Sequence, residues 1–183
     1  MKQLIHKYCI SILKFIIIVI ILNLSFMKIV VPTGSMLPTI RLNDYLIAQR
    51  HFFSLDRGDI IVFEPNDEEG EELYIKRLIG LPGDTISFKL IDGKSQLFVN
   101  NQALEESYST YSYDKEIEKI FIVPNDCYFF LGDNRANSYD SRFWSNSYIH
   151  KSQIKGKVIG NLSKIFPIIK KKTYQIQEYN TAK

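Results

Sequence analysis

The chain begins with one long apolar stretch. Shorter apolar runs follow, and residues typical of turns lie between them. From Phe15 to Val31 the sequence reads FIIIVIILNLSFMKIVV, and its apolar character extends back to Cys9, which makes 23 residues. The lysines Lys14 and Lys28 lie near the two ends, where a long side chain can carry its ammonium group to a membrane interface. Because about 20 apolar residues suffice to cross a bilayer, the pattern predicts a transmembrane anchor over residues 15–31.

Lysines on one side of this stretch indicate its orientation. Lys2, Lys7 and Lys14 all precede the apolar core. By the positive-inside rule, residues 1–14 lie in the cytoplasm and the chain after Val31 lies beyond the membrane. We therefore expect a single-pass protein of the inner or plasma membrane with an extracytoplasmic body.

A cleaved signal peptide is the rival interpretation, because it has the same basic start. Signal peptides have shorter apolar cores that end at an Ala-x-Ala-like site of small residues. Residues 25–27 (SFM) and 30–32 (VVP) match such a site poorly. The length of the core and this mismatch favour a retained anchor.

Beyond Pro32 the apolar runs are short and of β type, and long stretches with a helical period are missing. We therefore predict a mainly β domain over residues 32–169. The predicted strands span residues 44–50, 59–63, 73–79, 85–90, 96–99, 120–123, 127–131 and 158–162.

Three polar segments do not fit this pattern. Acidic residues 66–72 are typical of a solvated loop. The tyrosine-rich residues 102–119 form an excursion between strands, and the sequence assigns them no role. Residues 170–183 form a basic, polar C-terminal tail, for which a frayed end is a simpler interpretation than a contact with anionic lipid.

The formal charge of +3, from 23 Lys and Arg against 20 Asp and Glu, is unevenly distributed. Residues 1–31 contain four lysines and no acid, and residues 164–183 contain five lysines and one acid. The body between them therefore has 14 basic and 19 acidic residues. Because nucleic-acid binding needs clustered basic side chains, we expect no nucleic-acid partner.

Cysteine and histidine are too sparse to predict a disulfide framework or a metal centre. Cys9 lies in the apolar stretch and Cys127 in the body, and each is interpreted as a small buried hydrophobic side chain. The histidines His6, His51 and His150 are far apart in the sequence. We expect no metal and no cofactor.

Two residues form the most promising catalytic pair. The loop TGSMLPT places Ser35 after a glycine and before a proline, which allows a sharp turn and an accessible hydroxyl. Lys76 lies inside the apolar run LYIKRLI. A Ser/His/Asp arrangement can also be assembled with His51 or His150, but neither histidine lies in a distinctive local context.

Strand alternation separates Lys76 from Arg77. Tyr74, Lys76 and Leu78 share one face of the predicted strand, and Arg77 lies on the other. One of the two charges therefore points toward the packed side, unless the strand is exposed on both faces. If Lys76 points inward, desolvation lowers its pKa from about 10.4, and a fall of about 3 would supply a neutral amine near pH 7 to 8. Arginine could not serve as such a base, because it does not lose its proton.

Four segments resemble the sequence boxes of bacterial type I signal peptidases. They are GSMLPT at 34–39, RGDIIVF at 57–63, KRLIGLPGD at 76–84 and GDNRANSYDSRFW at 132–144. The boxes follow one N-terminal anchor in the family's order, and the short stretch between the last two resembles that of the smaller, single-anchor members. The resemblance implies antiparallel β-sheets around a Ser/Lys dyad, and removal of signal peptides from exported preproteins.

The resemblance also implies roles for individual residues. Ser35 is expected to attack the scissile carbonyl, and neutral Lys76 to accept its proton. The backbone N–H of Ser35 and the hydroxyl of Thr33, where many relatives have Ser, are expected to form the oxyanion hole. Ser138 is expected to orient the Lys76 amine.

Two supporting ion pairs follow from the same resemblance. They are Asp140 with Arg142, and Asp133 with Arg77, and the second would take this arginine away from the catalytic amine. The sequence departs from the family's common pattern at Ala136, where many relatives have Asp, a position outside the catalytic roles.

The expected partners are preprotein signal peptides and the lipid bilayer. An extended substrate would add as a strand beside the nucleophile. By resemblance, Val31 and Ile75 would wall pockets for Ala-sized side chains, in an Ala-x-Ala pattern, although both are equally interpretable as core residues. Two alternatives stay open: a Ser/Lys maturation peptidase dedicated to a pilus or conjugation substrate, and a non-catalytic, membrane-anchored β binding module.

Overall fold

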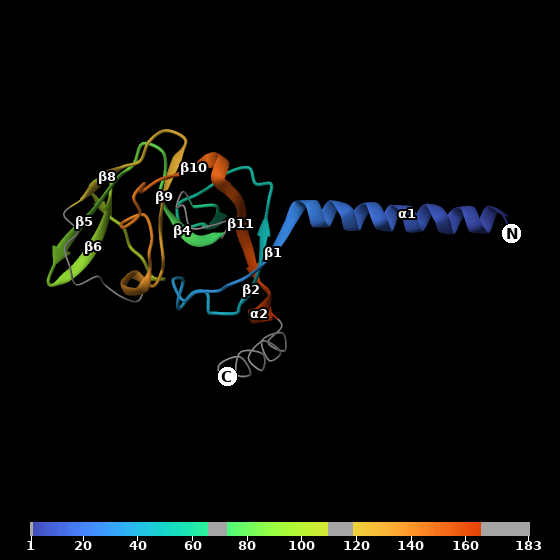
Figure 1. The fold of residues 1–183 in the computed structure, drawn as a ribbon, viewed down its shortest axis with the longest axis horizontal. Coiled ribbons are helices and arrows are strands. Elements are labelled where there is room, and N and C mark those ends of the chain that lie inside the picture. The colour runs from blue at the N-terminus through green and yellow to red at the C-terminus, as the bar shows by residue number, and fades with distance from the viewer. Residues whose placement is uncertain (1, 66–72, 110–118, 166–183) are drawn as a thin grey trace.

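The computed structural model describes residues 2–65, 73–109 and 119–165. It consists of one long N-terminal helix and a β-rich body (Figure 1). The helix, α1 (Lys2–Ser25), extends away from the body, which begins where the helix ends.

Helix α1 is long and apolar enough to cross a membrane. The 20 residues His6–Ser25 have a mean hydropathy of 2.3, and none of the apolar window is buried inside the protein. A signal sequence would share this length and composition. An uncovered apolar surface of this size is unfavourable in water and is typical of a segment that lies in lipid.

The boundary between the helix and the body differs from the predicted anchor over residues 15–31. The helix already begins at Lys2 and ends at Ser25, and strand β1 (Phe26–Val30) follows without a linker. Strand β1 pairs antiparallel with β2 (Tyr45–Gln49), so these five residues, four of them apolar, belong to the body. A continuous apolar run does not reveal the point at which a helix gives way to a strand, because both bury apolar side chains.

The first sheet is antiparallel and has seven strands in the order β1-β2-β11-β3-β4-β9-β10. Strand β11, the last in the sequence, lies between β2 and β3 and pairs with both. The strands besides β1 and β2 are β3 (Ile60–Phe63), β4 (Tyr74–Gly80), β9 (Cys127–Leu131), β10 (Ile149–His150) and β11 (Ile154–Asn161).

The second sheet is also antiparallel and lies on the side of the body away from α1 (Figure 1). Its order is β7-β6-β5-β8, so its centre is the hairpin of β5 and β6. The strands are β5 (Thr85–Ile91), β6 (Lys94–Val99), β7 (Gln102–Ala103) and β8 (Ile120–Ile122). Short helices complete the chain: η1 (Arg135–Asn137), η2 (Lys151–Gln153) and α2 (Leu162–Ile165).

The first sheet is packed on both faces. Consecutive residues of β3 point to opposite faces, and Ile61 and Val62 belong to two different buried clusters. Strand β4 is buried along almost its whole length. This double coverage decides the environment of Lys76 and Arg77, which lie on β4 and are both buried.

The predicted mainly β, antiparallel fold is confirmed, and each of the eight predicted strands corresponds to an observed one. Strand β11 begins at Ile154, four residues before its predicted start. The pattern missed β1, for the reason given above, and the two-residue strands β7 and β10, which are too short to show alternation. The predicted loop over 66–72, the tail over 170–183 and part of the 102–119 excursion lie outside the described residues.

Candidate active site

Ser35 lies in the loop that connects β1 to β2. The loop turns sharply, since the Leu37 N–H donates to the Gly34 carbonyl at 3.1 Å. Met36 anchors it, because this side chain packs in the same buried cluster as Val31. The loop therefore holds Ser35 against the sheet, where the residue is only 8% exposed.

Lys76 occupies the middle of β4 and points at Ser35. The residue is 6% exposed, and its Nζ donates a hydrogen bond to the Ser35 Oγ at 2.8 Å. The two residues lie 41 positions apart in the sequence, and packing of the β1–β2 loop on the sheet brings them together. A candidate nucleophile and a candidate base are thus in direct contact, away from bulk water.

The environment of Lys76 favours the neutral amine. Burial lowers the pKa of Lys76 from its ordinary 10.5 to about 8, and the charge of Asp140 opposes this effect only in part. No described residue forms an ion pair with Lys76. A sizeable fraction of the amine is therefore unprotonated at pH 7 to 8 and able to accept a proton.

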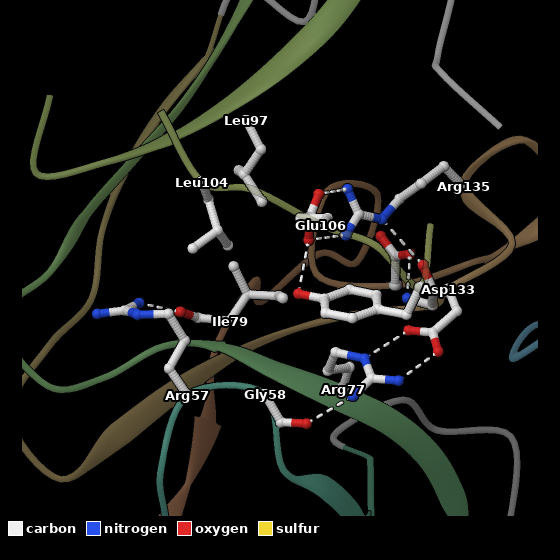
Figure 2. A network of polar contacts seen from close by, with 12 residues as sticks. Arg57, Gly58, Arg77, Ile79, Leu97, Leu104, Glu106, Asp133 and Arg135 are labelled. Carbon is white, nitrogen blue, oxygen red and sulfur yellow. Dashed lines mark hydrogen bonds and ion pairs between the residues drawn. The ribbon is translucent and has the colours of Figure 1, made fainter. Parts of the chain in front are cut away.

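Arg77, which follows Lys76 in the sequence, lies on the opposite face of β4 and binds other groups there. Its guanidinium forms a two-pronged ion pair with Asp133, with N–O distances of 2.7 and 2.5 Å, and its third nitrogen donates to the Gly58 carbonyl (Figure 2). The Tyr108 ring stacks on the guanidinium, with its centroid 3.8 Å from Cζ. Both charges of the Lys-Arg pair thus point into packed protein, one unpaired and one fully paired.

The expected pair of Asp140 and Arg142 also forms and is buried. Arg142 Nε lies 2.7 Å from Asp140 Oδ1, and Nη2 lies 2.9 Å from Oδ2. The same aspartate accepts from the Gly132 N–H at 3.0 Å, and Arg142 also donates to the Arg135 carbonyl. This cluster fixes the shape of the loop that follows β9.

Thr33 and Ser138, the expected helpers, differ in where their hydroxyls lie. The Thr33 Oγ1 is 3.3 Å from the Ser35 Oγ and stands beside the nucleophile. The Ser138 Oγ is buried and has no hydrogen-bond partner among the described residues, so the expected bond to Lys76 is not formed. It turns instead toward Gly132, which has no side chain to exclude it, and a rotamer of this kind cannot be read from sequence.

A cavity of about 480 Å³ opens beside the dyad. Its walls come from residues 31–36, from residues 73–76 and from Asn134, Asn137 and Tyr139 in the loop after β9. They include Val31 and Ile75. Residues 74–76 of β4 pair with β3, whereas the pairing with β9 begins at Arg77. One edge of β4 is therefore available beside the cavity, next to Lys76.

The histidines considered for a Ser/His arrangement lie away from this cavity. The His150 ring caps the short helix η2 through Ser152, and His51 is exposed. Neither residue lines the cavity.

Sequence reasoning missed a second polar cluster behind the site. Glu106 forms a two-pronged ion pair with Arg135 and accepts the Tyr108 hydroxyl at 2.9 Å (Figure 2). Arg135 in turn donates to the Gly132 carbonyl at 3.0 Å. Burial, followed by the nearby charge of Glu106, raises the pKa of Tyr108, so its hydroxyl stays protonated. Only the fold connects these residues, because Glu106 and Arg135 are 29 positions apart.

Comparison with known proteins shows which family the chain resembles. Residues 4–162 match the model of a family described as signal peptidase, peptidase S26. A signal peptidase I of Bacillus caldolyticus is 36% identical over 149 residues, which cover 73% of this chain and 77% of that protein. A signal peptidase I of Leptolyngbya laminosa is 42% identical over 140 residues, which cover 70% of this chain and 64% of that protein.

One further relative and one solved structure match a smaller part of their own length or of this chain. A probable signal peptidase I-2 of a Synechocystis strain is 36% identical, and the match spans 58% of its length. The chain thus spans less than two thirds of the length of this relative and of the one from Leptolyngbya laminosa. A crystal structure of a signal peptidase I from Enterococcus faecalis is 29% identical with a TM-score of 0.47, covering 60% of this chain and all of that one.

The buried amine of Lys76 should reduce the stability of the fold at neutral pH. Because its pKa is about 8 in the folded protein and 10.5 in an exposed lysine, the folded state binds protons less tightly. The resulting cost is about 3 kcal/mol below pH 8, and it disappears as the pH rises from about 8 to 10.5. We expect Lys76→Met to be more stable than the wild type at pH 7, with a smaller difference at pH 10.

Chemical unfolding of the full chain in detergent at both pH values measures this difference. Lys89→Met, at an exposed strand position, is the matched control and should show no such gain. A Lys76→Met variant that is less stable than the wild type at pH 7 would contradict the buried, unpaired amine.

Proposed function

Because the chain belongs to the signal peptidase family, peptidase S26, we propose that it is a membrane-anchored serine endopeptidase that removes signal peptides from exported preproteins. The observation that carries the proposal is the 2.8 Å hydrogen bond between Lys76 Nζ and Ser35 Oγ at a buried position. A lysine with a pKa of about 8, in contact with a serine, is suited to activate it.

The reaction would follow the steps of acyl transfer. Neutral Lys76 accepts the Ser35 proton as the Oγ attacks the scissile carbonyl, and then gives that proton to the leaving amine. The Ser35 N–H and the Thr33 hydroxyl stabilise the negative oxygen of the tetrahedral intermediate. Lys76 next accepts a proton from the water that hydrolyses the acyl-enzyme, and Ser35 is regenerated.

The substrate would bind as an added strand. The available edge of β4 at residues 74–76 supports this mode, because its backbone groups can bond to an extended peptide that enters the cavity. Val31 and Ile75 are buried and line the same cavity. Apolar walls this close to the nucleophile favour small residues, in keeping with cleavage after an Ala-x-Ala pattern.

The protein would be anchored by α1, with its N-terminus in the cytoplasm and its body beyond the membrane. The apolar, uncovered helix and the lysines at its start support this arrangement. Signal peptides emerge on that side, so the proposed orientation places the dyad where its substrate is cut.

Cleavage of a fluorogenic Ala-x-Ala peptide in detergent tests the dyad. We expect turnover by the wild type and a loss of about 10⁴-fold or more in kcat/KM for Ser35→Ala and Lys76→Met, because each removes one half of the nucleophile–base pair. Lys76→Arg should be equally inactive, since arginine does not release its proton. Equal turnover in all four proteins would refute the dyad.

The same assay separates the alternative functions. Absence of turnover in the wild type would favour a non-catalytic binding module. Cleavage of one pilus or conjugation precursor, with several unrelated preproteins left intact, would favour the dedicated maturation peptidase.

Activity should rise with pH as Lys76 loses its proton. The reactive form is the neutral amine, so kcat/KM is expected to increase through a midpoint of about 8. The charge of Asp140 raises this pKa, so Asp140→Asn should move the midpoint to lower pH, where the variant is stable enough to measure. A wild-type midpoint near 10 would show that the base is not buried.

The orientation is testable in spheroplasts. A protease added outside should degrade the body and leave a short N-terminal fragment protected by the membrane and the cytoplasm. The control is the same treatment after the membrane has been opened with detergent, when the fragment should also be cut. A body that resists the protease until detergent is added would place it on the cytoplasmic side.

A further inference from the structure

The loop after β9 touches the nucleophile loop through its backbone. A side chain at Gly132 would place its Cβ 2.5 Å from both the Ser138 Cβ and the carbonyl oxygen of Ser35. Only glycine permits this approach, because contacts that short do not occur between ordinary side chains and backbone. The two loops therefore sit in a fixed position relative to one another.

Asn134 makes two hydrogen bonds across this contact. Its backbone N–H donates to the Ser35 carbonyl at 3.0 Å, and its side-chain Nδ2 donates to the Gly34 carbonyl at 3.1 Å. The residue is 6% exposed. One asparagine thus holds the carbonyl groups on both sides of the nucleophile.

Apart from its bond to the Gly34 carbonyl, the side chain of Asn134 makes no hydrogen bond to a described residue. The residue stands at the N-cap of η1, where asparagine commonly accepts a backbone N–H, but it makes no side-chain cap bond there. Its Oδ1 is buried and has no partner among the described residues. A buried polar atom without a bond is costly, so the orientation of this amide is explained by its bond to Gly34 and not by its own surroundings.

The Gly34 carbonyl accepts hydrogen bonds from Asn134 Nδ2 and from the Leu37 N–H, and these bonds determine where the Ser35 N–H points. The Gly34 carbonyl and the Ser35 N–H belong to one trans peptide group, in which C=O and N–H point in opposite directions. Holding the carbonyl against Asn134 therefore turns the N–H away from the 132–138 loop. No described residue accepts a hydrogen bond from this N–H.

We propose that Asn134 is a positioning residue that locks the Gly34–Ser35 peptide, so that the Ser35 N–H is ready to bind the oxyanion. The inference rests on the proposed peptidase function and adds a residue to it. Without the Asn134 bond, only the Leu37 N–H holds the Gly34 carbonyl. The peptide can then rotate more easily and present this carbonyl to the oxyanion, which repels it. Asn134 also lines the cavity, and the role proposed here acts through its bond to the Gly34 carbonyl.

The test replaces Asn134 by leucine, which keeps the branched shape and removes the donor. Because the replacement also removes the unpaired Oδ1, the unfolding midpoint should be unchanged or higher. We expect kcat for an Ala-x-Ala peptide to fall by about 10²-fold or more, the range for a lost oxyanion donor, while KM stays within about threefold. The pH midpoint should remain near 8, because the contact between Lys76 and Ser35 is untouched.

A peptide aldehyde supplies a second readout. The Ser35 oxygen adds to the aldehyde carbon and Lys76 takes the hydroxyl proton, which leaves an anionic oxygen that needs the Ser35 N–H. Asn134→Leu should weaken inhibition by the aldehyde about as much as it lowers kcat. The matched control is Asn146→Leu, which removes an exposed side-chain bond to the Tyr148 N–H and should leave both values unchanged.

Each outcome decides the proposal. Wild-type kcat and aldehyde inhibition in Asn134→Leu would overturn it. A fall in kcat with a lower unfolding midpoint or a shifted pH midpoint would also overturn it, because the effect would then come from folding or from the dyad. A wild-type protein without turnover would overturn the peptidase function and this inference together.

Discussion

The site depends on burying one lysine without giving it a carboxylate partner. A carboxylate in contact with Lys76 would hold its amine in the charged form and remove the base. Asp133 and Asp140 both come from the same loop region, and each is bound at both oxygens by an arginine. Because arginine keeps its proton, these ion pairs persist at pH values at which Lys76 is neutral. Arg142 thus binds Asp140, the acid whose charge raises the pKa of Lys76, and Arg77 binds Asp133 on the opposite face of β4.

This constraint also explains the second polar cluster. Arg77 is adjacent to Lys76 on β4, so any movement of Arg77 would disturb the strand that carries the base. Asp133, the Gly58 carbonyl and the Tyr108 ring hold its guanidinium on three sides. Tyr108 is itself tied to Glu106, in the segment that leads away from the second sheet. Glu106 and Tyr108, in the described part of the excursion, therefore support the face of β4 that lies opposite the dyad.

Sequence alone predicted the parts of this arrangement that local pattern controls. Alternation on β4 required Lys76 and Arg77 to point to opposite faces, and burial of one charge followed from it. The structure buries both, because the sheet is packed on both faces. The strands with five or more residues in the body were also recognisable, apart from β1. Its apolar residues continue the pattern of the helix, and only the pairing with β2 separates the two.

Contacts between distant segments and side-chain rotamers were not predictable in the same way. The sequence around Glu106 does not indicate that this residue pairs with an arginine 29 positions later. The Ser138 hydroxyl points to the space that a side chain at position 132 would otherwise fill. The role proposed for Asn134 needs the relative position of two loops that are 100 residues apart. These features depend on the packed fold, whereas strand pattern depends on neighbours along the chain.

The absence of a linker after α1 restricts where the proposed dyad could act. Ser25 ends the helix, β1 occupies the next five residues, and Ser35 follows after a short turn. At about 3.3 Å per residue, the ten residues from Ser25 to Ser35 span at most about 33 Å. Because β1 is paired within the sheet, this span is rigid and cannot lengthen to follow a distant substrate. Under the proposed anchoring, the dyad reaches only those cleavage sites that lie near the membrane surface, so the anchor itself contributes to substrate selection.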